Sequence, residues 1–430
     1  MDAKVTQVQL PNGMVLLLKE MHHAPVVSWW VLYRVGSRNE TPGITGASHW
    51  VEHMMFKGTP TFPAGELDRV ISREGGEWNA FTWIDCTAYH ETLPADRIDI
   101  GLRLEADRMI NARFDPEAVA SERTVIISER QGAENSPLFL LGEEMQNAAY
   151  RVHPYRHEII GDLADLQNMT RDDLYRHYRR FYHPGNAIGV AVGDFDTEAM
   201  LARLHELYAP LSPGEPAPPI LRAEPEQRGA RRVTVEREGT TAFVSLACHA
   251  PIATEDDYFR MMVMDSVLSG ASGLGFLGGG VSNKTSRLYR ALVETELAAG
   301  VSGGLAPTID PYLYSITATV RPDRTPEEVE AALVAEIDRI AREPVSAEEL
   351  AKAKKQAKAL FAYTSESITN QAIWLGMSHI VSGGVAWFET YLDRLLAVSA
   401  EDVQDVAQRY LKPSRRTMGW FVPLGGDGAV

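Results

Sequence analysis

The two halves of this chain carry matching residues at a constant offset of 229 positions, which predicts a duplicated fold. Asp173 in the first half corresponds to Asp402 in the second, and Pro184 corresponds to Pro413. A short apolar run typical of a buried strand follows each of the two prolines. At 430 residues the chain is also too long for one ordinary domain, so two domains of about 200 residues are expected.

Strand-like and helix-like runs alternate irregularly within each half. Residues 26–33 are mostly apolar and predict a strand buried on both faces, with a loose match at 242–246 in the second half. A helix is expected over residues 115–130, because Asp115 suits the N-cap and a proline follows it. Another is expected over 347–360, which is rich in Ala, Lys and Glu. We therefore expect an α+β fold of two homologous domains, each a mostly antiparallel sheet packed against helices.

A proline-rich stretch between the halves predicts the boundary between the two domains. Residues 211–219 contain four prolines, and such stretches form semi-rigid spacers between folded units. We expect an N-terminal domain at 1–212, a linker at 213–228 and a homologous C-terminal domain at 229–430.

The composition argues against several classes of function. The net charge of −16 disfavours a nucleic-acid binder, which normally carries basic patches. No apolar run approaches the roughly 20 residues that cross a bilayer, so no membrane span is expected. The only cysteines, Cys86 and Cys248, lie far apart, which excludes a disulfide framework and a cysteine-based zinc site. Residues 1–6 contain no apolar signal-peptide core, and the compartment stays open between the cytoplasm and, if a signal peptide has been removed, the periplasm.

The first half contains an H-x-x-E-H pattern formed by His49, Glu52 and His53. Two histidines four residues apart on a helix point only about 40° away from each other, so both can reach one Zn²⁺. Glu52 lies close to the same face and can polarise a metal-bound water without being a ligand. Thr45 is a candidate N-cap for this helix, and Gly58 is a candidate stop signal.

A zinc site of this kind needs a third protein ligand, which the spacing of residues does not identify. Nearby candidates with suitable side chains are Asp85, His90, Glu91, Glu122 and Glu129. Glu122 and Glu129 lie seven residues apart on the helix predicted from Asp115, and so share one face of it. A solvated helix face explains such a pair equally well.

Residues 46–59, which contain the H-x-x-E-H pattern, resemble the signature of the M16 (pitrilysin/insulinase) metallopeptidases, or inverzincins. Within this family they look most like subfamily B, which includes the mitochondrial processing peptidase. The resemblance covers essentially the whole chain, including its two halves. It continues in Asn79, Ala80, Phe81 and Thr82, in residues 85–89, in His153, Pro154 and Tyr155, and in Gly161.

The resemblance implies a complete site that binds one Zn²⁺ per chain. The family's third ligand is a glutamate 76 residues after the second histidine, which corresponds to Glu129 here. A second family glutamate, seven residues earlier, supports the site from nearby and corresponds to Glu122. His49 and His53 would complete the ligand set and leave one position for water, and Glu52 would act as the general base.

The resemblance also implies that the substrates are peptides or unfolded segments. Residues 79–82 resemble the family's edge strand, which pairs with an extended substrate through backbone hydrogen bonds. A plain sheet edge is the alternative interpretation of these four residues.

The sequence departs from the family at an Arg/Tyr pair that helps to stabilise the oxyanion in self-sufficient members. The family spacing from the anchor block 286–288 places these residues at Val293 and Gly300, so neither is present. We assign the nearby Arg287, Tyr289 and Arg290 to packing or surface roles.

The missing pair implies that this chain is the zinc-bearing subunit of a heterodimer. A homologous M16B subunit without the zinc motif would supply the Arg and the Tyr. The alternatives are a homodimeric oligopeptidase and a non-catalytic assembly subunit, although the latter usually goes with a degraded zinc motif.

A glycine-rich segment at Gly270–Gly280 has two interpretations. As a phosphate-binding loop it is weak, because no Lys-Ser/Thr follows at the required spacing. It resembles the glycine-rich loop of the non-catalytic processing-peptidase subunit, which touches substrate. A mobile loop without a binding role is the other interpretation.

Overall fold

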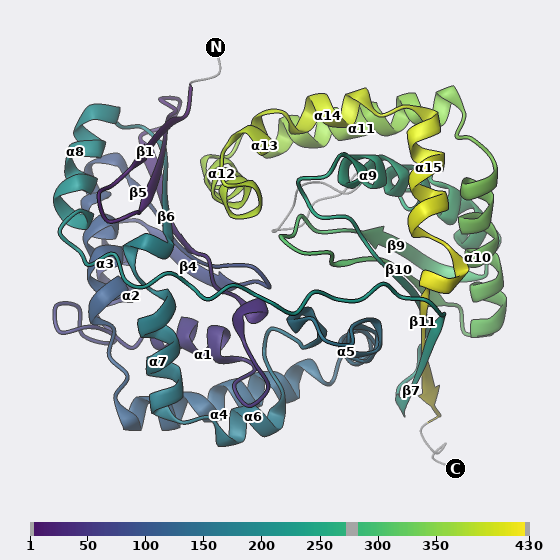
Figure 1. Ribbon diagram of the computed structural model, residues 1–430, viewed down its shortest axis with the longest axis horizontal. Coiled ribbons are helices and arrows are strands. Elements are labelled where there is room, and N and C mark those ends of the chain that lie inside the picture. Colours follow the sequence, from purple (N-terminus) through teal and green to yellow (C-terminus); the bar gives the residue numbers. More distant parts are fainter. Residues whose placement is uncertain (1–3, 272–282, 426–430) are drawn as a thin grey trace. The chain divides into compact units, whose positions relative to one another are not determined.

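The computed structural model describes residues 4–271 and 283–425 and divides into two compact units (Figure 1). Unit 1 consists of Met1–Gln131, His157–Arg222 and Ser365–Val385. Unit 2 consists of Gly132–Arg156, Ala223–Thr364 and Ala386–Val430. Each unit therefore takes a segment from the other half of the sequence. Most of the segment Gly270–Gly280 lies outside the described residues.

Each unit is built on one sheet, and the two sheets share one strand order. The sheet of unit 1 has the order β1-β2-β6-β3-β5-β4, and the sheet of unit 2 has the order β7-β11-β8-β10-β9. The strands are β1 (Thr6–Gln9), β2 (Val15–Glu20), β3 (Val26–Tyr33), β4 (Glu77–Thr82), β5 (Thr87–Pro94), β6 (Ala187–Gly193), β7 (Arg231–Glu238), β8 (Phe243–His249), β9 (Ala298–Gly304), β10 (Leu313–Val320) and β11 (Thr417–Leu424).

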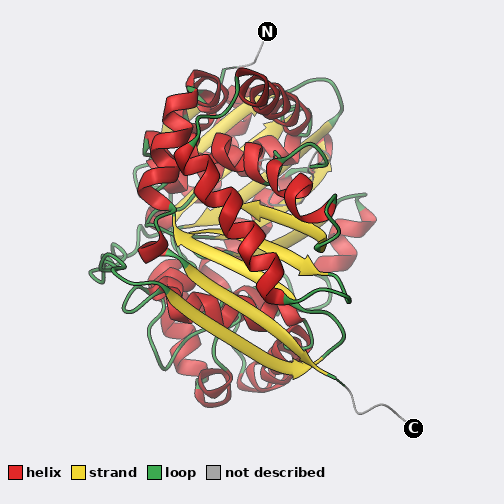
Figure 2. Cartoon of the chain, turned by 90° about the vertical axis from the view of Figure 1, so that its right-hand side faces the viewer, coloured by secondary structure: helices red, strands yellow, loops and turns green. Residues whose placement is uncertain are grey.

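The pairing directions confirm the predicted duplication and the mostly antiparallel sheets. The only parallel pairs between described strands are β2 with β6 in unit 1 and β7 with β11 in unit 2. These pairs occupy equivalent places in the two strand orders, and β1 is an addition at the edge of the first sheet. The long strands β7 and β11 run side by side towards the C-terminal end in Figure 2.

Helices cover both sheets, and those predicted from the sequence are present with small shifts of their ends. In unit 1 they are α1 (Ala47–Met54), α2 (Leu67–Arg73), α3 (Asp99–Asn111), α4 (Pro116–Ala133), α6 (Leu163–Asn168), α7 (Arg171–Phe181), α8 (Thr197–Tyr208) and α12 (Ile368–Ser382). In unit 2 they are α5 (Pro137–Ala149), α9 (Asp256–Leu268), α10 (Pro326–Arg342), α11 (Ala347–Thr364), α13 (Ala386–Glu389), α14 (Tyr391–Ala397) and α15 (Ala400–Tyr410).

The repeated aspartates are helix-capping residues. The Thr170 hydroxyl accepts from the backbone N–H of Asp173, and the Asp173 carboxylate accepts from the backbone N–H of Thr170. Ser399 and Asp402 form the same capping box at the start of α15. This arrangement satisfies backbone donors that the first turn of a helix leaves unpaired. The 229-residue offset thus reflects two equivalent helix starts.

The two faces of the unit 1 sheet are covered by different parts of the sequence. On one face, Trp29 and Val31 of β3 pack with Trp50 and Val51 of α1 in a continuous apolar core. On the other face, α12 from the second half packs against β3 and β6, and Figure 1 shows it on the side of β6. A Cβ on Gly376 of α12 would lie 2.6 Å from a Leu32 methyl group, so the glycine allows this close approach.

The sheet of unit 2 receives α5 from the first half in a comparable way. Leu141 and Met145 of α5 form an apolar cluster with Ala247 and Phe421. A Cβ on Gly419 of β11 would lie 2.5 Å from the sulfur of Met145, so a glycine again permits the contact. The boundaries of the compact units therefore differ from those of the continuous segments 1–212 and 229–430. The reason is that one of the helices packed on each sheet comes from the other half of the sequence.

The linker is irregular, and one carboxylate fixes its end to the segment after α5. Residues 212–230, all of which are described, contain no helix or strand. Glu224 accepts three backbone hydrogen bonds, from Arg151, Val152 and His153, at 2.8, 2.9 and 3.1 Å. These bonds outweigh the effect of burial and lower the pKa of Glu224.

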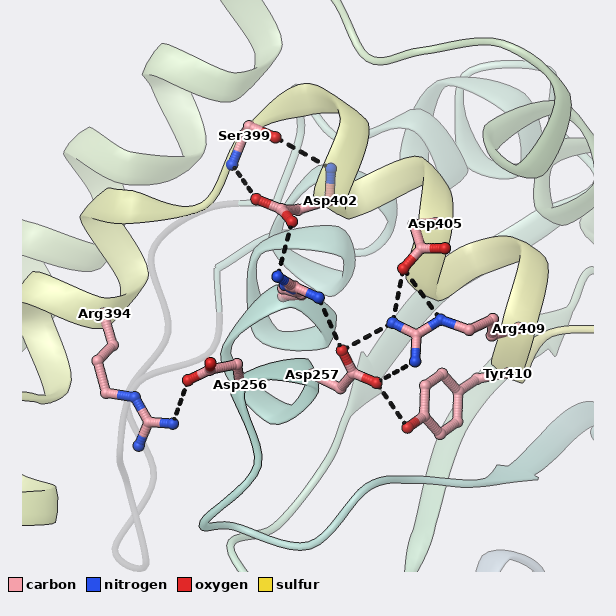
Figure 3. A network of polar contacts seen from close by, with 9 residues as sticks. Asp256, Asp257, Arg394, Ser399, Asp402, Asp405, Arg409 and Tyr410 are labelled. Carbon is pink, nitrogen blue, oxygen red and sulfur yellow. Dashed lines mark hydrogen bonds and ion pairs between the residues drawn. The ribbon is translucent and has the colours of Figure 1, made fainter.

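In unit 2, α9 and α15 are joined by a polar network around Asp257 (Figure 3). Arg409 of α15 binds both carboxylate oxygens of Asp257, at 2.5 and 2.7 Å, and the Tyr410 hydroxyl donates to the same group at 2.8 Å. Arg260 links Asp257 to Asp402, the capping residue of α15. Charge-assisted hydrogen bonds thus hold α9, the first helix of the second half, against α15.

A cluster of ionisable side chains from β5 and α3 is completely buried in unit 1. Glu91 of β5 and Glu105 of α3 both bind the guanidinium of Arg108, and the side chains of all three have no exposed area. Arg108 also lies over the ring of Tyr89, 4.4 Å from its centroid. Burial, together with the neighbouring Glu105, raises the pKa of Glu91 well above its ordinary value.

We predict that the melting temperature of Glu91→Gln increases relative to that of the unsubstituted chain as the pH rises from 5 to 8. Between the ordinary pKa and the raised one, the folded state keeps a proton at Glu91 that the unfolded state releases, so stability falls as the pH rises through this range. Glutamine resembles the protonated carboxyl and lacks this dependence. Melting temperatures across the pH range measure the effect, with the exposed Glu77→Gln as control. Parallel curves for Glu91→Gln and the unsubstituted chain would contradict it.

Candidate metal centre

The N-cap of the helix that carries the H-x-x-E-H pattern lies one residue after Thr45. The N-cap of α1 is Gly46, at φ +85°, where a Cβ would lie 2.4 Å from the carbonyl oxygen of Ile160. The buried Glu40 carboxylate accepts from the backbone N–H groups of Gly46 and Ser48, at 2.8 and 2.7 Å. The prediction of Thr45 as N-cap is therefore wrong, because a more distant carboxylate satisfies the first turn.

The structure brings His49, His53 and Glu129 together. The Glu129 Oε2 atom of α4 lies 3.8 Å from Nε2 of His49 and 3.7 Å from Nε2 of His53, both on α1. Among the described residues, this is the only group of three His, Cys, Asp or Glu side chains positioned to hold one metal ion. The histidines are largely buried, whereas the Glu129 side chain is 49% exposed, so the group is open to solvent on the side of Glu129.

The donor atoms fit a zinc ion. Two imidazole nitrogens and one carboxylate oxygen are ligands that zinc accepts, and tetrahedral coordination places such atoms about 3.4 Å apart. The observed separations of 3.7 and 3.8 Å are slightly wider, and small side-chain rotations can close them. Burial and the neighbouring His53 lower the pKa of His49 to about 3, which keeps its imidazole neutral, as a metal ligand must be.

Glu122 and Lys57 fix the orientation of His53. Oε1 of Glu122 lies 2.8 Å from Nδ1 of His53, and Oε2 lies 2.5 Å from the Lys57 ammonium. Burial raises the pKa of Glu122, but the hydrogen bonds from Lys57 and His53 outweigh it and lower the pKa overall. An ionised Glu122 accepts the Nδ1 proton of His53 and leaves the Nε2 lone pair directed towards Glu129.

Glu52 is buried beside the two histidines and is held by one hydroxyl group. The Oγ1 of Thr82, the last residue of β4, donates to Oε2 of Glu52 at 2.6 Å. Burial raises the pKa of Glu52, while the hydrogen bond from Thr82 acts in the opposite direction. Sequence reasoning assigned Thr82 to the substrate and missed this contact. The alternation of β4 could have indicated it, because Trp78 and Ala80 also face the core.

The other third-ligand candidates serve structural roles. Asp85 pairs with Arg38 at 3.7 Å, and His90 stacks on Trp30 with ring centroids 4.2 Å apart. Glu91 belongs to the buried cluster around Arg108. None of the three is in the group formed with His49 and His53.

Residues 79–82 lie on β4, the last strand of the unit 1 sheet. β4 pairs only with β5 among the described strands, so its outer edge has no strand partner. The Asn79 side chain is exposed, and its oxygen accepts from the backbone N–H of Ala80 at 2.9 Å. An edge strand that has a strand partner on one side only can accept an extended peptide on the other.

Arg287 is engaged in unit 2 in a way that matches its predicted packing role. Its guanidinium forms a bidentate pair with Glu349 of α11, at 2.7 and 2.9 Å, and only 8% of its side chain is exposed. This pair lowers the pKa of Glu349 to about 2. Gly300, the position where the family tyrosine was expected, lies on β9.

Two family models of one peptidase family match the chain in succession. "Insulinase (Peptidase family M16)" matches residues 15–163, and "Peptidase M16 inactive domain" matches residues 168–357. The first match contains the group formed by His49, His53 and Glu129. The second match contains α9, a helix without a histidine. The chain therefore belongs to the M16 peptidase family and carries two M16-type domains.

Known relatives span nearly the whole chain. The zinc protease PqqE of Helicobacter pylori is 29% identical over 426 residues, which cover 98% of this chain and 93% of the relative. The crystal structure of a protease from Helicobacter pylori matches with a TM-score of 0.92 at 28% identity, covering 98% of this chain and 100% of that chain. The periplasmic protease PqqL of Escherichia coli shares the fold, with a TM-score of 0.78 at 19% identity, covering 98% of this chain but 48% of that chain.

These comparisons confirm the predicted resemblance at the level of the family, while subfamily B stays a prediction. Among the described residues, no helix is long and apolar enough to cross a membrane.

Proposed function

We propose that this chain is a zinc-dependent endopeptidase that cleaves peptides or unfolded segments. The observation that carries the proposal is the convergence of His49, His53 and Glu129 beside the buried Glu52. Three ligands of this type leave one coordination position for water, as catalytic zinc sites require. The printed names of the relatives, which describe them as zinc proteases, agree with this role.

Each residue of the site has a distinct part in the proposed reaction. A bound zinc ion supplies a Lewis acid that makes water nucleophilic near neutral pH and polarises the peptide carbonyl. Glu52 takes the proton from the attacking water on a carboxylate oxygen and passes it to the leaving amine. Glu122 holds the His53 ring by its Nδ1 atom, and Lys57 holds Glu122 in turn.

The substrate is proposed to add a strand at the free edge of β4. Backbone hydrogen bonds along residues 79–82 would hold an extended peptide with little dependence on its side chains. β4 also ends at Thr82, which contacts Glu52, so a peptide on this edge would pass close to the catalytic group. This geometry favours unfolded substrates, because their backbone can extend along the edge of β4.

A homologous partner chain is proposed to complete the oxyanion site. This chain has Val293 and Gly300 where the family pair is expected, and Arg287 is occupied by Glu349. The structural match with PqqL covers 98% of the present chain but only 48% of PqqL. The rest of PqqL is therefore long enough for a second unit of similar size. We therefore favour a heterodimer with a subunit that lacks the zinc motif, with a homodimer as the alternative.

We expect removal of zinc to abolish hydrolysis and re-addition of zinc to restore it. The purified chain should contain one zinc ion, and Glu129→Gln should bind it much more weakly, because the charged third ligand is lost. Metal analysis together with cleavage of a fluorogenic peptide measures both effects. Glu117→Gln, an exposed position at the start of α4, is the control. Full activity in a zinc-free preparation would disprove the proposal. A protein that holds zinc but cleaves no peptide, whichever partner is added, would favour the assembly-subunit alternative.

The partner is tested by mixing the chain with a homologue encoded beside it. Lost oxyanion donors typically cost about 10²- to 10³-fold in kcat, so the homologue should raise activity by a factor of this size. Titration of the homologue should saturate at one partner per chain. Full activity of the pure chain would exclude the two-protein arrangement and leave the homodimer.

A further inference from the structure

The hydroxyl of Thr82 is the only protein donor on the Glu52 carboxylate among the hydrogen bonds of the described residues. The bond is 2.6 Å long, and both side chains are 9% exposed. Hydroxyl-to-carboxylate bonds of this length are charge-assisted and stronger than those between neutral groups. The contact joins β4 to α1 through two residues that are 30 positions apart in the sequence.

The neighbouring hydroxyl does not compete for this role. Thr87, which pairs with Thr82 across β4 and β5, donates its proton to the carbonyl oxygen of Val35 at 2.8 Å. Its oxygen lies 3.5 Å from that of Thr82, at the limit of a hydrogen bond. A threonine hydroxyl has a single proton to donate, and that of Thr82 is directed to Glu52.

The position of a general base limits the rate of proton transfer. Such a base must lie within about 2.6–3.2 Å of the proton that it removes. Glutamate has three rotatable side-chain bonds, so a hydrogen bond to one oxygen restricts where the other can lie. A displacement of about 1 Å can reduce the rate by roughly 100-fold.

We propose that Thr82 is a positioning residue that aligns Glu52 and couples this alignment to the substrate-binding edge. This inference rests on the proposed function. Thr82 terminates the same strand whose free edge is offered to the peptide, and its side chain points from that strand to the base. The strand that binds the substrate therefore also fixes the group that activates water.

The test compares two substitutions of Thr82 that differ in the hydroxyl. Thr82→Val keeps the shape and removes the donor, whereas Thr82→Ser keeps the donor. We expect kcat to fall about 10- to 100-fold in Thr82→Val, with KM and zinc content unchanged, and to stay within about threefold of the unsubstituted value in Thr82→Ser. Thr92→Val is the matched control, because it removes a hydroxyl bonded to Ser28 near the opposite end of the same strand pair.

A double-mutant cycle separates positioning from a structural role. In the Glu52→Gln background, Thr82→Val should produce no further loss of the residual rate, because the aligned group is gone. The inference would be overturned if Thr82→Val kept the kcat of the unsubstituted chain. It would also be overturned if Thr82→Val lowered the rate by the same factor with Glu52 present and with Glu52→Gln. If Thr82→Val does not fold, as judged by its melting temperature, Thr82→Ala takes its place in the cycle. Unchanged hydrolysis in Glu52→Gln alone would instead refute the proposed function.

Discussion

Glu52→Gln is expected to lower kcat for peptide hydrolysis by about 10²- to 10⁴-fold while the chain keeps its zinc ion. Glutamine has nearly the shape of glutamate, and its amide oxygen can still accept the hydrogen bond from Thr82. It cannot accept a proton from water at neutral pH. The loss should therefore fall on kcat, with little change in KM or in melting temperature.

The measurement combines steady-state kinetics with metal analysis on the same preparation. Glu117→Gln makes the same chemical change at an exposed position and should leave kcat unaltered. The metal content decides how a loss of activity is interpreted: a chain that loses zinc as well has lost its site, whereas a zinc-loaded inactive chain has lost its base. Hydrolysis at the unsubstituted rate would remove Glu52 from the mechanism.

The separated halves 1–212 and 229–430 are expected not to fold alone, but to form a stable complex when they are produced together. In unit 1, twelve of the fifteen residues of α12 are buried, including Ile373, Trp374 and Leu375. Each large apolar side chain that becomes exposed costs about 1.5–3 kcal/mol. Several such losses equal or exceed the 5–15 kcal/mol that typically separates a folded domain from its unfolded state.

The experiment follows solubility and cooperative thermal unfolding of each half and of the co-produced pair. Gly376→Val should lower the melting temperature of the full chain, because its side chain would collide with Leu32. Gly384→Ala belongs to the same segment, and its added Cβ meets no atom within 4 Å, so it is the control. A first half that unfolds cooperatively on its own would show that the exchanged helix is dispensable.

Local patterns predicted much of the fold and of the metal group. The 229-residue offset aligned Asp173 with Asp402, which the structure shows to be equivalent members of two capping boxes, and capping depends on residues only a few positions apart. The spacing of His49 and His53 likewise placed both rings on one face of α1. The choice of Glu129 needed the family resemblance, because several carboxylates had suitable local surroundings.

The remaining features depend on contacts between distant segments. The apolar pattern of α12 shows that it is buried, but not which sheet it covers, and so the exchange of helices was not predicted. Similarly, the N-terminus of α1 is satisfied by Glu40 and not by the adjacent Thr45. Thr82 was assigned to the substrate through the family resemblance, and its contact with Glu52 was not predicted because the two residues are 30 positions apart.

The exchange of helices also sets the time at which the metal centre can mature during protein synthesis. The sheet that carries the centre needs the segment Ser365–Val385 for its second face, and this segment is synthesised more than 230 residues after Glu129. Domains generally fold on the ribosome from the N-terminus onward. Here the first unit needs a helix from the second half, so a growing chain that already contains His49, His53 and Glu129 still lacks one covering layer of the unit 1 sheet.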